Sequence, residues 1–172
     1  MTHDSYSDDY ILEILGSNRT IALVGASANK VRPSYFALKY LLEKGYTVIP
    51  VNPGLAGKEL LGRKVYGRLG EIPAPVDIVD IFRPSAEALE LTKEAVEIGA
   101  KVIWMQLGVR NDEAAQLAEG AGLKVVMNRC PKIEYARLSG EIGWAGVNSR
   151  TISSAKPALG PRGYQHRILR SG

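Results

Sequence analysis

Thr20-Ile21-Ala22-Leu23-Val24-Gly25-Ala26-Ser27-Ala28-Asn29-Lys30 is the stretch that decides the fold of this 172-residue chain. Its first part is apolar and rich in β-branched residues, which is typical of a buried strand. Small residues follow and lead to Pro33, which suits the first turn of a helix. Such a turn lets phosphate groups approach the backbone N–H groups at a helix start. The stretch therefore predicts the phosphate-binding turn of a Rossmann-like domain.

The turn lacks two glycines of the dinucleotide fingerprint G-x-G-x-x-G. After Gly25 the fingerprint requires glycine at positions 27 and 30, where the chain has Ser27 and Lys30. An NAD site also uses an acid after the second strand to bind the ribose, and that position here falls within Val51-Asn52-Pro53. An NADP site tolerates the missing acid, because a cation binds its extra phosphate. The turn thus argues against NAD and leaves NADP open.

Apolar segments and amphipathic segments alternate along the rest of the chain. Further strands are expected at 47–51, 76–82, 101–105 and 123–127, with a short extended piece at 64–66. Helices are expected at 8–16, 33–44, 85–98 and 111–119. This alternation predicts the α/β class, with a Rossmann-like doubly wound parallel sheet of about five strands in a three-layer αβα arrangement. Residues 8–138 form the predicted domain, and 139–172 form an extension with a flexible tail.

Composition indicates a soluble cytoplasmic protein. The chain is 45% hydrophobic and 23% charged, and Cys130 is its only cysteine. Neither a secretory signal nor a membrane-spanning run is visible in the sequence. The net charge of +4 comes from residues 149–172, which hold five basic residues and no acid. This tail predicts a solvated arm, and nucleic-acid binding through it is the less favoured interpretation.

Residues that follow the expected strands gather at one edge of a parallel sheet. Four of them are cations, namely Lys30, Arg32, Arg83 and Arg129, and none is a carboxylate. A cationic edge free of acid favours a polyanionic ligand. NADP and other ligands with an adenosine phosphate and a diphosphate fit this edge equally well.

The chain contains five stretches that resemble, in sequence and in order, those of the small stand-alone CoA-binding proteins related to the N-terminal domain of the succinyl-CoA synthetase α subunit. They are Val24-Gly25-Ala26-Ser27, Pro50-Val51-Asn52-Pro53-Gly54, Val79-Asp80-Ile81-Phe82-Arg83, Trp104-Met105-Gln106-Leu107-Gly108-Val109 and Asn128-Arg129-Cys130-Pro131. Gly143-Trp144 and Val147-Asn148-Ser149 resemble the C-terminal stretch of the same proteins. The resemblance covers residues 8–157 and implies a Rossmann-like fold that holds coenzyme A across the strand ends.

The resemblance also implies which residues bind the cofactor. Contacts to the diphosphate are implied for Gly25, Ala26 and Ser27, and contacts to the adenosine for Pro50, Asn52 and Pro53. Phe82 and Arg83 would line the next part of the groove, and the pantetheine and its thiol would lie toward Gln106, Leu107, Gly108, Asn128 and Cys130. The phosphate-contacting lysine of the synthetase is replaced by Leu55, so Lys30, Arg32 or Lys58 must supply that cation. The segment 128–132 also has one inserted residue and lacks the glycine of the synthetase pattern.

Several of these residues have a purely structural alternative. Gly25 and Ser27 serve a tight turn equally well, and Asn52 suits a turn before Pro53. Cys130 is either a small packing residue or a thiol that forms a mixed disulfide with CoA. Trp104 is expected in the core, and Gln106 is expected to face the ligand.

The sequence favours a non-catalytic CoA-binding protein over an enzyme. No catalytic triad, metal cluster or Walker loop is visible, and the domain that carries the synthetase phosphohistidine is not expected here. The two histidines, His3 and His166, fall in termini expected to be flexible. The function favoured is therefore a carrier, sensor or regulator that binds CoA or an acyl-CoA, with a protein partner and the oligomeric state left open. The alternative is an NADP-dependent oxidoreductase or redox sensor on the same fold.

Overall fold

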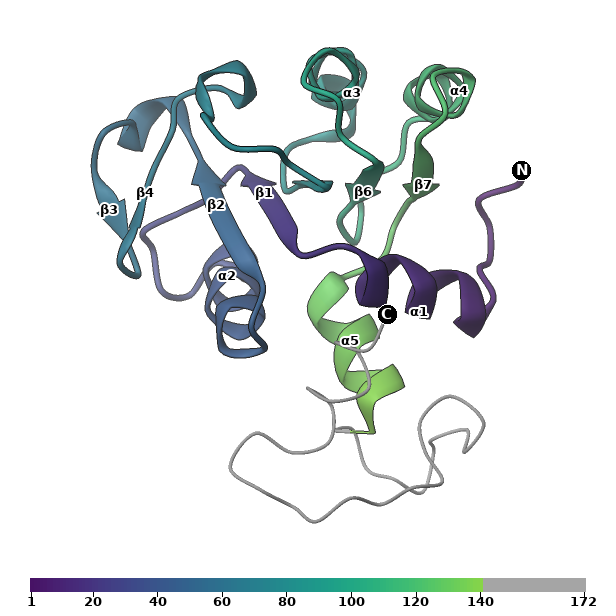
Figure 1. Cartoon of the computed structure of the whole chain (residues 1–172), viewed down its shortest axis with the longest axis horizontal. Coiled ribbons are helices and arrows are strands. Elements are labelled where there is room, and N and C mark those ends of the chain that lie inside the picture. Colours follow the sequence, from purple (N-terminus) through teal and green to yellow (C-terminus); the bar gives the residue numbers. More distant parts are fainter. Residues whose placement is uncertain (141–172) are drawn as a thin grey trace.

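A five-stranded parallel sheet organises residues 1–140, the part of the chain that the computed structural model describes (Figure 1). Its strands are β1 (Thr20–Val24), β2 (Thr47–Val51), β5 (Ile78–Ile81), β6 (Val102–Met105) and β7 (Lys124–Val126), in the order β2-β1-β5-β6-β7. All neighbouring strands are parallel. The predicted α/β Rossmann-like sheet is thereby confirmed.

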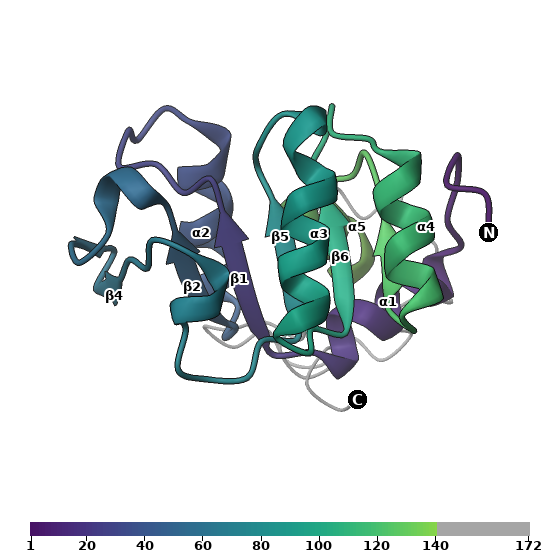
Figure 2. The ribbon, with the colours of Figure 1, turned by 90° about the horizontal axis from the view of Figure 1, so that it is seen from above.

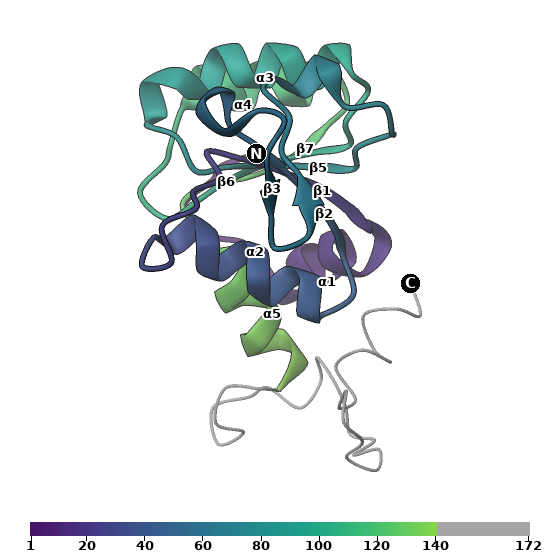
Figure 3. The same ribbon diagram turned by 90° about the vertical axis from the view of Figure 1, so that its left-hand side faces the viewer.

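Helices cover both faces of the sheet, which gives three layers (Figure 3). On one face lie α1 (Asp8–Ser17), α2 (Pro33–Glu43) and α5 (Pro131–Ser139), and on the other lie α3 (Ala88–Glu97) and α4 (Asp112–Gly120). Successive strand residues point to opposite faces, so Leu23 and Trp104 enter one core cluster while Val24 and Met105 enter the other. Both faces are buried, which explains the nearly continuous apolar strands.

The helix starts follow the expected chemistry. Pro33 opens α2, and Asn111 caps α4 because its Oδ1 accepts from the Ala114 N–H at 2.9 Å. The helix expected at 85–98 consists of a 3-10 turn, η3 (Ser85–Glu87), followed by α3. The strand expected at 76–82 is shorter, because only Ile78–Ile81 pairs with its neighbours.

Helix α5 was not predicted from the sequence. Pro131 opens it and Gly140, at φ +84°, ends it. Tyr135 and Leu138 pack into the core, whereas Arg137 forms an ion pair with Asp8 at 2.8 Å. The segment combines apolar and charged residues, and its contacts with α1 and α2 stabilise it as a helix in the folded chain.

An insert between β2 and β5 lies beside the edge strand β2 (Figure 2). It contains η1 (Pro53–Leu55), the antiparallel pair β3 (Glu59–Leu60) and β4 (Arg63–Lys64), and η2 (Leu69–Glu71). The extended piece expected at 64–66 is present in part, because Tyr66 pairs with Val51 in a parallel bridge. The insert therefore covers part of the β2 edge and brings residues 67–69 toward the strand ends.

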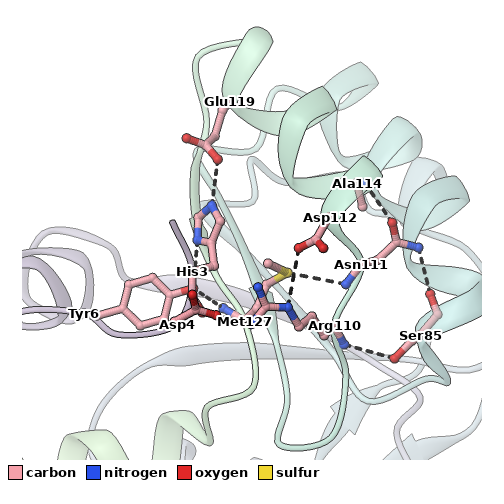
Figure 4. Close-up of polar contacts among 10 residues, drawn as sticks. All are labelled: His3, Asp4, Tyr6, Ser85, Arg110, Asn111, Asp112, Ala114, Glu119 and Met127. Carbon is pink, nitrogen blue, oxygen red and sulfur yellow. Dashed lines mark hydrogen bonds and ion pairs between the residues drawn. The ribbon is translucent and has the colours of Figure 1, made fainter. Parts of the chain in front are cut away.

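The N-terminal segment is ordered against the body of the domain, so the expectation of a flexible His3 was wrong (Figure 4). His3 is buried, and its ring nitrogens lie 2.8 Å from the Tyr6 hydroxyl and 2.7 Å from Glu119 Oε1. The Tyr6 hydroxyl in turn accepts from the Met127 N–H at 2.8 Å. These contacts hold the segment beside β7 and α4. His166, the stretches at 143–149 and nearly all of the predicted extension lie outside the described residues.

Candidate functional site

The candidate site lies where the ends of β1 and β5 meet. After β1 the chain passes to α2 and the edge strand β2, and after β5 it passes to α3, on the opposite face, and to β6. Connections therefore diverge to the two sides of the sheet between β1 and β5 (Figure 2). Open α/β sheets bind ligands at the carboxyl ends of their strands at such a switch point.

Gly25 allows the turn after β1 to lie against the end of β5. Its φ is +93°, and a Cβ at this position would lie 2.6 Å from the Phe82 carbonyl oxygen. The N–H groups of Gly25 and Ala26 both donate to the Val51 carbonyl, at 3.0 and 3.3 Å. Gly25 is thus required by packing, and the turn's backbone donors that remain for a ligand come after Ala26.

Short polar contacts fix the rest of this turn. Ser27 Oγ accepts from the Asn29 N–H at 3.0 Å, and Asn29 Oδ1 accepts from the Val31 N–H at 3.1 Å. The side chains of Lys30 and Arg32 are exposed beside this loop. The turn is therefore preorganised, with two cations next to it.

Asn52 joins the β1 turn to the loop after β2. Its Nδ2 donates to the Ala26 carbonyl at 2.6 Å, and its Oδ1 accepts from the Gly54 N–H at 2.8 Å. The structural interpretation of Asn52 as a turn residue before Pro53 is confirmed. Because both ends of its amide are engaged, Asn52 shapes the site through the backbone.

Two cavities meet at the switch point, and together they form what we call the strand-end groove. The first lobe has a volume of about 340 Å³ and lies over the ends of β2, β1 and β5. The second lobe has a volume of about 850 Å³ and extends over the ends of β6 and β7. Both lobes share Gly25, Asn52 and Arg83. A ligand that fills both would thus bend around the β1 turn.

Twelve of the residues implied by the resemblance line this groove. They are Gly25, Ala26, Ser27, Arg32, Asn52, Pro53, Phe82, Arg83, Gln106, Leu107, Gly108 and Cys130. Residues from five separate segments of the chain are therefore brought to one edge of the sheet.

Three other candidates do not line either lobe. Pro50 is buried within β2, and Lys30 lies exposed on the loop before α2. Asn128, in the left-handed region at φ +57°, accepts from the Gly108 N–H at 2.8 Å and so holds the loop after β6. The rim cation Arg129 contacts the Asp4 carbonyl and Glu134, because it folds toward the N-terminal segment.

The expectation of a rim without carboxylates was wrong. Glu87 and Glu94 line the first lobe, and Arg83 forms an ion pair with Glu87 at 2.9 Å. The acids come from η3 and α3, and the turn that leads from Arg83 into η3 brings Glu87 within reach of the Arg83 guanidinium. Both partners are about half exposed, so the pair contributes at most about 1 kcal/mol and a phosphate can compete for Arg83.

Sequence reasoning missed two cations of the groove. Arg68 lines the first lobe because the insert after β2 folds back toward the strand ends. The pattern of strands in the sequence does not predict this change of direction. Lys132 lines the second lobe from α5, with its Nζ 5.7 Å from the Phe36 ring centre and 5.8 Å from that of Tyr40. The first turn of the unpredicted helix α5 therefore belongs to the site.

Buried polar groups lie beneath and within the second lobe. Trp104 is fully buried, and its Nε1 donates to the Arg129 carbonyl at 2.9 Å, which confirms its place in the core. Asp80, its neighbour in β5, is also fully buried, and burial raises the pKa of its carboxyl well above the usual range. Gln106 lines the lobe, is 8% exposed, and its Oε1 has no hydrogen-bond partner among residues 1–140. A ligand N–H would satisfy this oxygen.

The fold, the turn and the groove define a Rossmann-like α/β domain with a two-lobed groove at its strand ends. The family model of the CoA binding domain matches residues 19–136, so the chain belongs to the family of CoA-binding domains. The expected resemblance is confirmed.

Relatives of two kinds share this domain. The uncharacterized protein YneT of Bacillus subtilis (strain 168) is 40% identical over 126 residues, which cover 73% of this chain and 92% of YneT. A hypothetical protein from Pyrococcus horikoshii OT3, of known structure, is 42% identical with a TM-score of 0.75, over 80% of this chain and 95% of that one. The alpha subunit of acetate–CoA ligase [ADP-forming] I of Pyrococcus furiosus is 35% identical over 96 residues, which cover 54% of this chain and 21% of that subunit.

Neither a membrane-spanning helix nor a metal-binding cluster is found in residues 1–140. None of the helices there is both long and apolar enough to span a membrane. Within the same residues, no group of three or more histidine, cysteine or acidic side chains is arranged to hold a metal ion.

Proposed function

We propose that this protein binds coenzyme A or an acyl-CoA in the strand-end groove and acts as a non-catalytic carrier, sensor or regulator in the cytoplasm. The observation that carries the proposal is the two-lobed groove, whose lobes meet at the β1 turn. CoA has the matching form, with a diphosphate between an adenosine arm and a longer pantetheine arm. The match of residues 19–136 to the CoA binding domain supports this ligand over other adenosine phosphates.

The first lobe suits the adenosine end of the ligand. Val51, Pro53 and Leu69 give it an apolar lining, and Arg68 and Arg83 supply positive charge. Guanidinium groups bind phosphate oxygens in a bidentate manner, so these arginines suit the phosphates on this side of the turn. Breaking the ion pair between Arg83 and Glu87 requires little free energy, because both side chains are about half exposed.

The turn after β1 suits the diphosphate. Ser27 and the residues after it lie at the approach to α2, with Arg32 beside them. Backbone N–H groups and a nearby cation together favour a phosphate. Gly25 allows the approach because no side chain projects from this point of the turn.

The second lobe suits pantetheine. Gln106 Oε1 is a buried acceptor without a partner among residues 1–140, and pantetheine carries amide N–H donors. Phe82, Leu107 and Cys130 provide apolar contact along the same lobe. Asp80 is fully buried and lines neither lobe, and burial raises the pKa of its carboxyl, which favours the uncharged form.

Thermal unfolding with separate additions of CoA, acetyl-CoA, NAD and NADP tests this proposal. A ligand that binds only the folded state at 100 times its Kd stabilises it by about 2.7 kcal/mol, which corresponds to roughly 5–10 °C in Tm. We expect this shift with CoA or acetyl-CoA and none with NAD. Arg83→Gln should reduce the shift, whereas Arg63→Gln, on β4 outside both lobes, should not. A shift with NADP and none with CoA would overturn the proposal.

A further inference from the structure

Exposed apolar side chains are concentrated at the second lobe of the groove. Seven large hydrophobic side chains are exposed in residues 1–140, and four of them line this lobe. These four are Val31 (76% exposed), Phe36 (49%), Leu107 (51%) and Ile133 (46%), and we call them the apolar mouth. The other three are Met1, Leu61 and Leu117, which line neither lobe.

The apolar mouth is assembled from three separate parts of the chain. Val31 precedes α2, Phe36 lies in its first turns, Leu107 follows β6 and Ile133 lies in the first turn of α5. Helices α2 and α5 contact each other, and Lys132 of α5 lies against the Phe36 ring. Apolar residues that converge from distant segments on a cavity are typical of a binding surface.

The second lobe changes in chemistry from one end to the other. Where it joins the first lobe it is lined by Gly25, Asn52 and Arg83, which suits phosphate. Toward β6 and β7 it is lined mainly by the apolar side chains of Leu107, Cys130 and Ile133. Lys132 also lies there, with its Nζ held over the rings of Phe36 and Tyr40. A ligand that fills the lobe should therefore be anionic near the turn and hydrocarbon-like at the far end.

We propose that the apolar mouth holds the acyl chain of an acyl-CoA, so that the preferred ligand is a thioester with a saturated chain of four or more carbons. This inference rests on the proposed function, in which the pantetheine arm occupies the second lobe. Free CoA ends in a thiol and offers nothing to cover four exposed apolar side chains. An acyl chain continues from the sulfur and buries them, and the hydrophobic effect then favours the longer ligand.

Calorimetric titration of the full chain with CoA, acetyl-CoA, butyryl-CoA and hexanoyl-CoA tests the inference. A fully buried methylene improves affinity up to about fourfold, so partial burial at the mouth should give about twofold for each added carbon. We expect Kd to fall steadily from CoA to hexanoyl-CoA, by about tenfold or more overall. Equal Kd values for CoA and hexanoyl-CoA would overturn the inference and leave CoA binding intact, and this result would point to a protein partner or to residues beyond 140 at the mouth. Failure of every ligand to bind would overturn the proposed function as well.

Variants of exposed side chains test whether the apolar mouth causes the dependence of Kd on acyl-chain length. Phe36→Ser and Ile133→Ser should bring the ratio of the Kd for CoA to that for hexanoyl-CoA toward one. Leu117→Ser is the matched control, because Leu117 is exposed to a similar extent on α4 and lines neither lobe. This control should keep the ratio of the unmodified protein. Survival of the chain-length dependence in both mouth variants would contradict the assignment, and the Tm of each variant shows that it remains folded.

Discussion

Replacement of Gly25 by alanine tests how closely the β1 turn lies against the end of β5. The new methyl group would face two obstacles, namely the backbone φ of +93° and the Phe82 carbonyl oxygen at 2.6 Å. The first costs about 1–2 kcal/mol for a residue with a Cβ. The second is a clash with the Phe82 carbonyl oxygen, a backbone atom that cannot rotate away as a flexible side chain could. Overpacking of this kind costs about 1–3 kcal/mol. Together they predict a loss of about 2–5 kcal/mol in the free energy of unfolding.

Gly57→Ala separates the two contributions. Gly57 has a φ of +83°, and a Cβ there would have no atom within 4 Å, so this variant carries the backbone strain without the clash. We expect it to lose about 1–2 kcal/mol. The difference between the two variants, about 1–3 kcal/mol, isolates the contact between the turn and Phe82.

Urea unfolding at 25 °C, followed by far-UV circular dichroism, measures both variants against the unmodified protein. Gly25→Ala should show the lower midpoint at an unchanged slope. Its Tm should also fall below that of Gly57→Ala by roughly 2–12 °C. Equal stability of the two variants would refute the close approach, and with it the geometry assigned to the diphosphate site.

Three further results are expected. Because burial raises the pKa of the Asp80 carboxyl, the folded protein keeps this proton at pH values where the unfolded chain has released it, so the free energy of unfolding should fall as the pH rises above about 4. Asp80→Asn should remove this pH dependence in urea unfolding between about pH 4 and 8. An unchanged pH dependence in the variant would refute the role assigned to Asp80. His3→Ala should cost about 1–2 kcal/mol of stability because it breaks contacts with Tyr6 and Glu119, and a neutral effect would contradict the ordered N-terminus. Arg83→Gln should weaken CoA binding roughly tenfold at low salt, with a smaller difference at high salt; equal affinities would exclude a phosphate contact.

The strands could be predicted from the sequence because burial on both faces leaves a nearly continuous apolar run. The segment 47–51 is identified with its exact bounds for this reason. Helix α5 escaped prediction because its buried residues, such as Tyr135, alternate with charges whose ion pairs form only in the folded chain. Local sequence therefore indicates the sheet but not every helix that covers it.

The site was predictable to the extent that it depends on strand ends. Residues directly after β1, β5 and β6 line the groove, as the topology requires. Arg68 and Glu94 could not be found in this way, because an insert and a helix bring them back to the groove from elsewhere. The ion pair that Glu87 forms with Arg83 could not be predicted either, because the turn that leads into η3, and not a strand position, creates it.

The claim that CoA lies across the strand ends is tested most directly by two-dimensional ¹⁵N–¹H NMR of the labelled protein during titration with CoA. The largest amide shifts should fall at residues 25–32, at Asn52 and Gly54, and at residues 106–108. Additional changes should appear at Arg83, Cys130, Lys132 and Ile133, where the two lobes continue. Shifts confined to α1, α4 or the β3–β4 pair, or no shifts at all, would contradict the placement of the ligand in the strand-end groove.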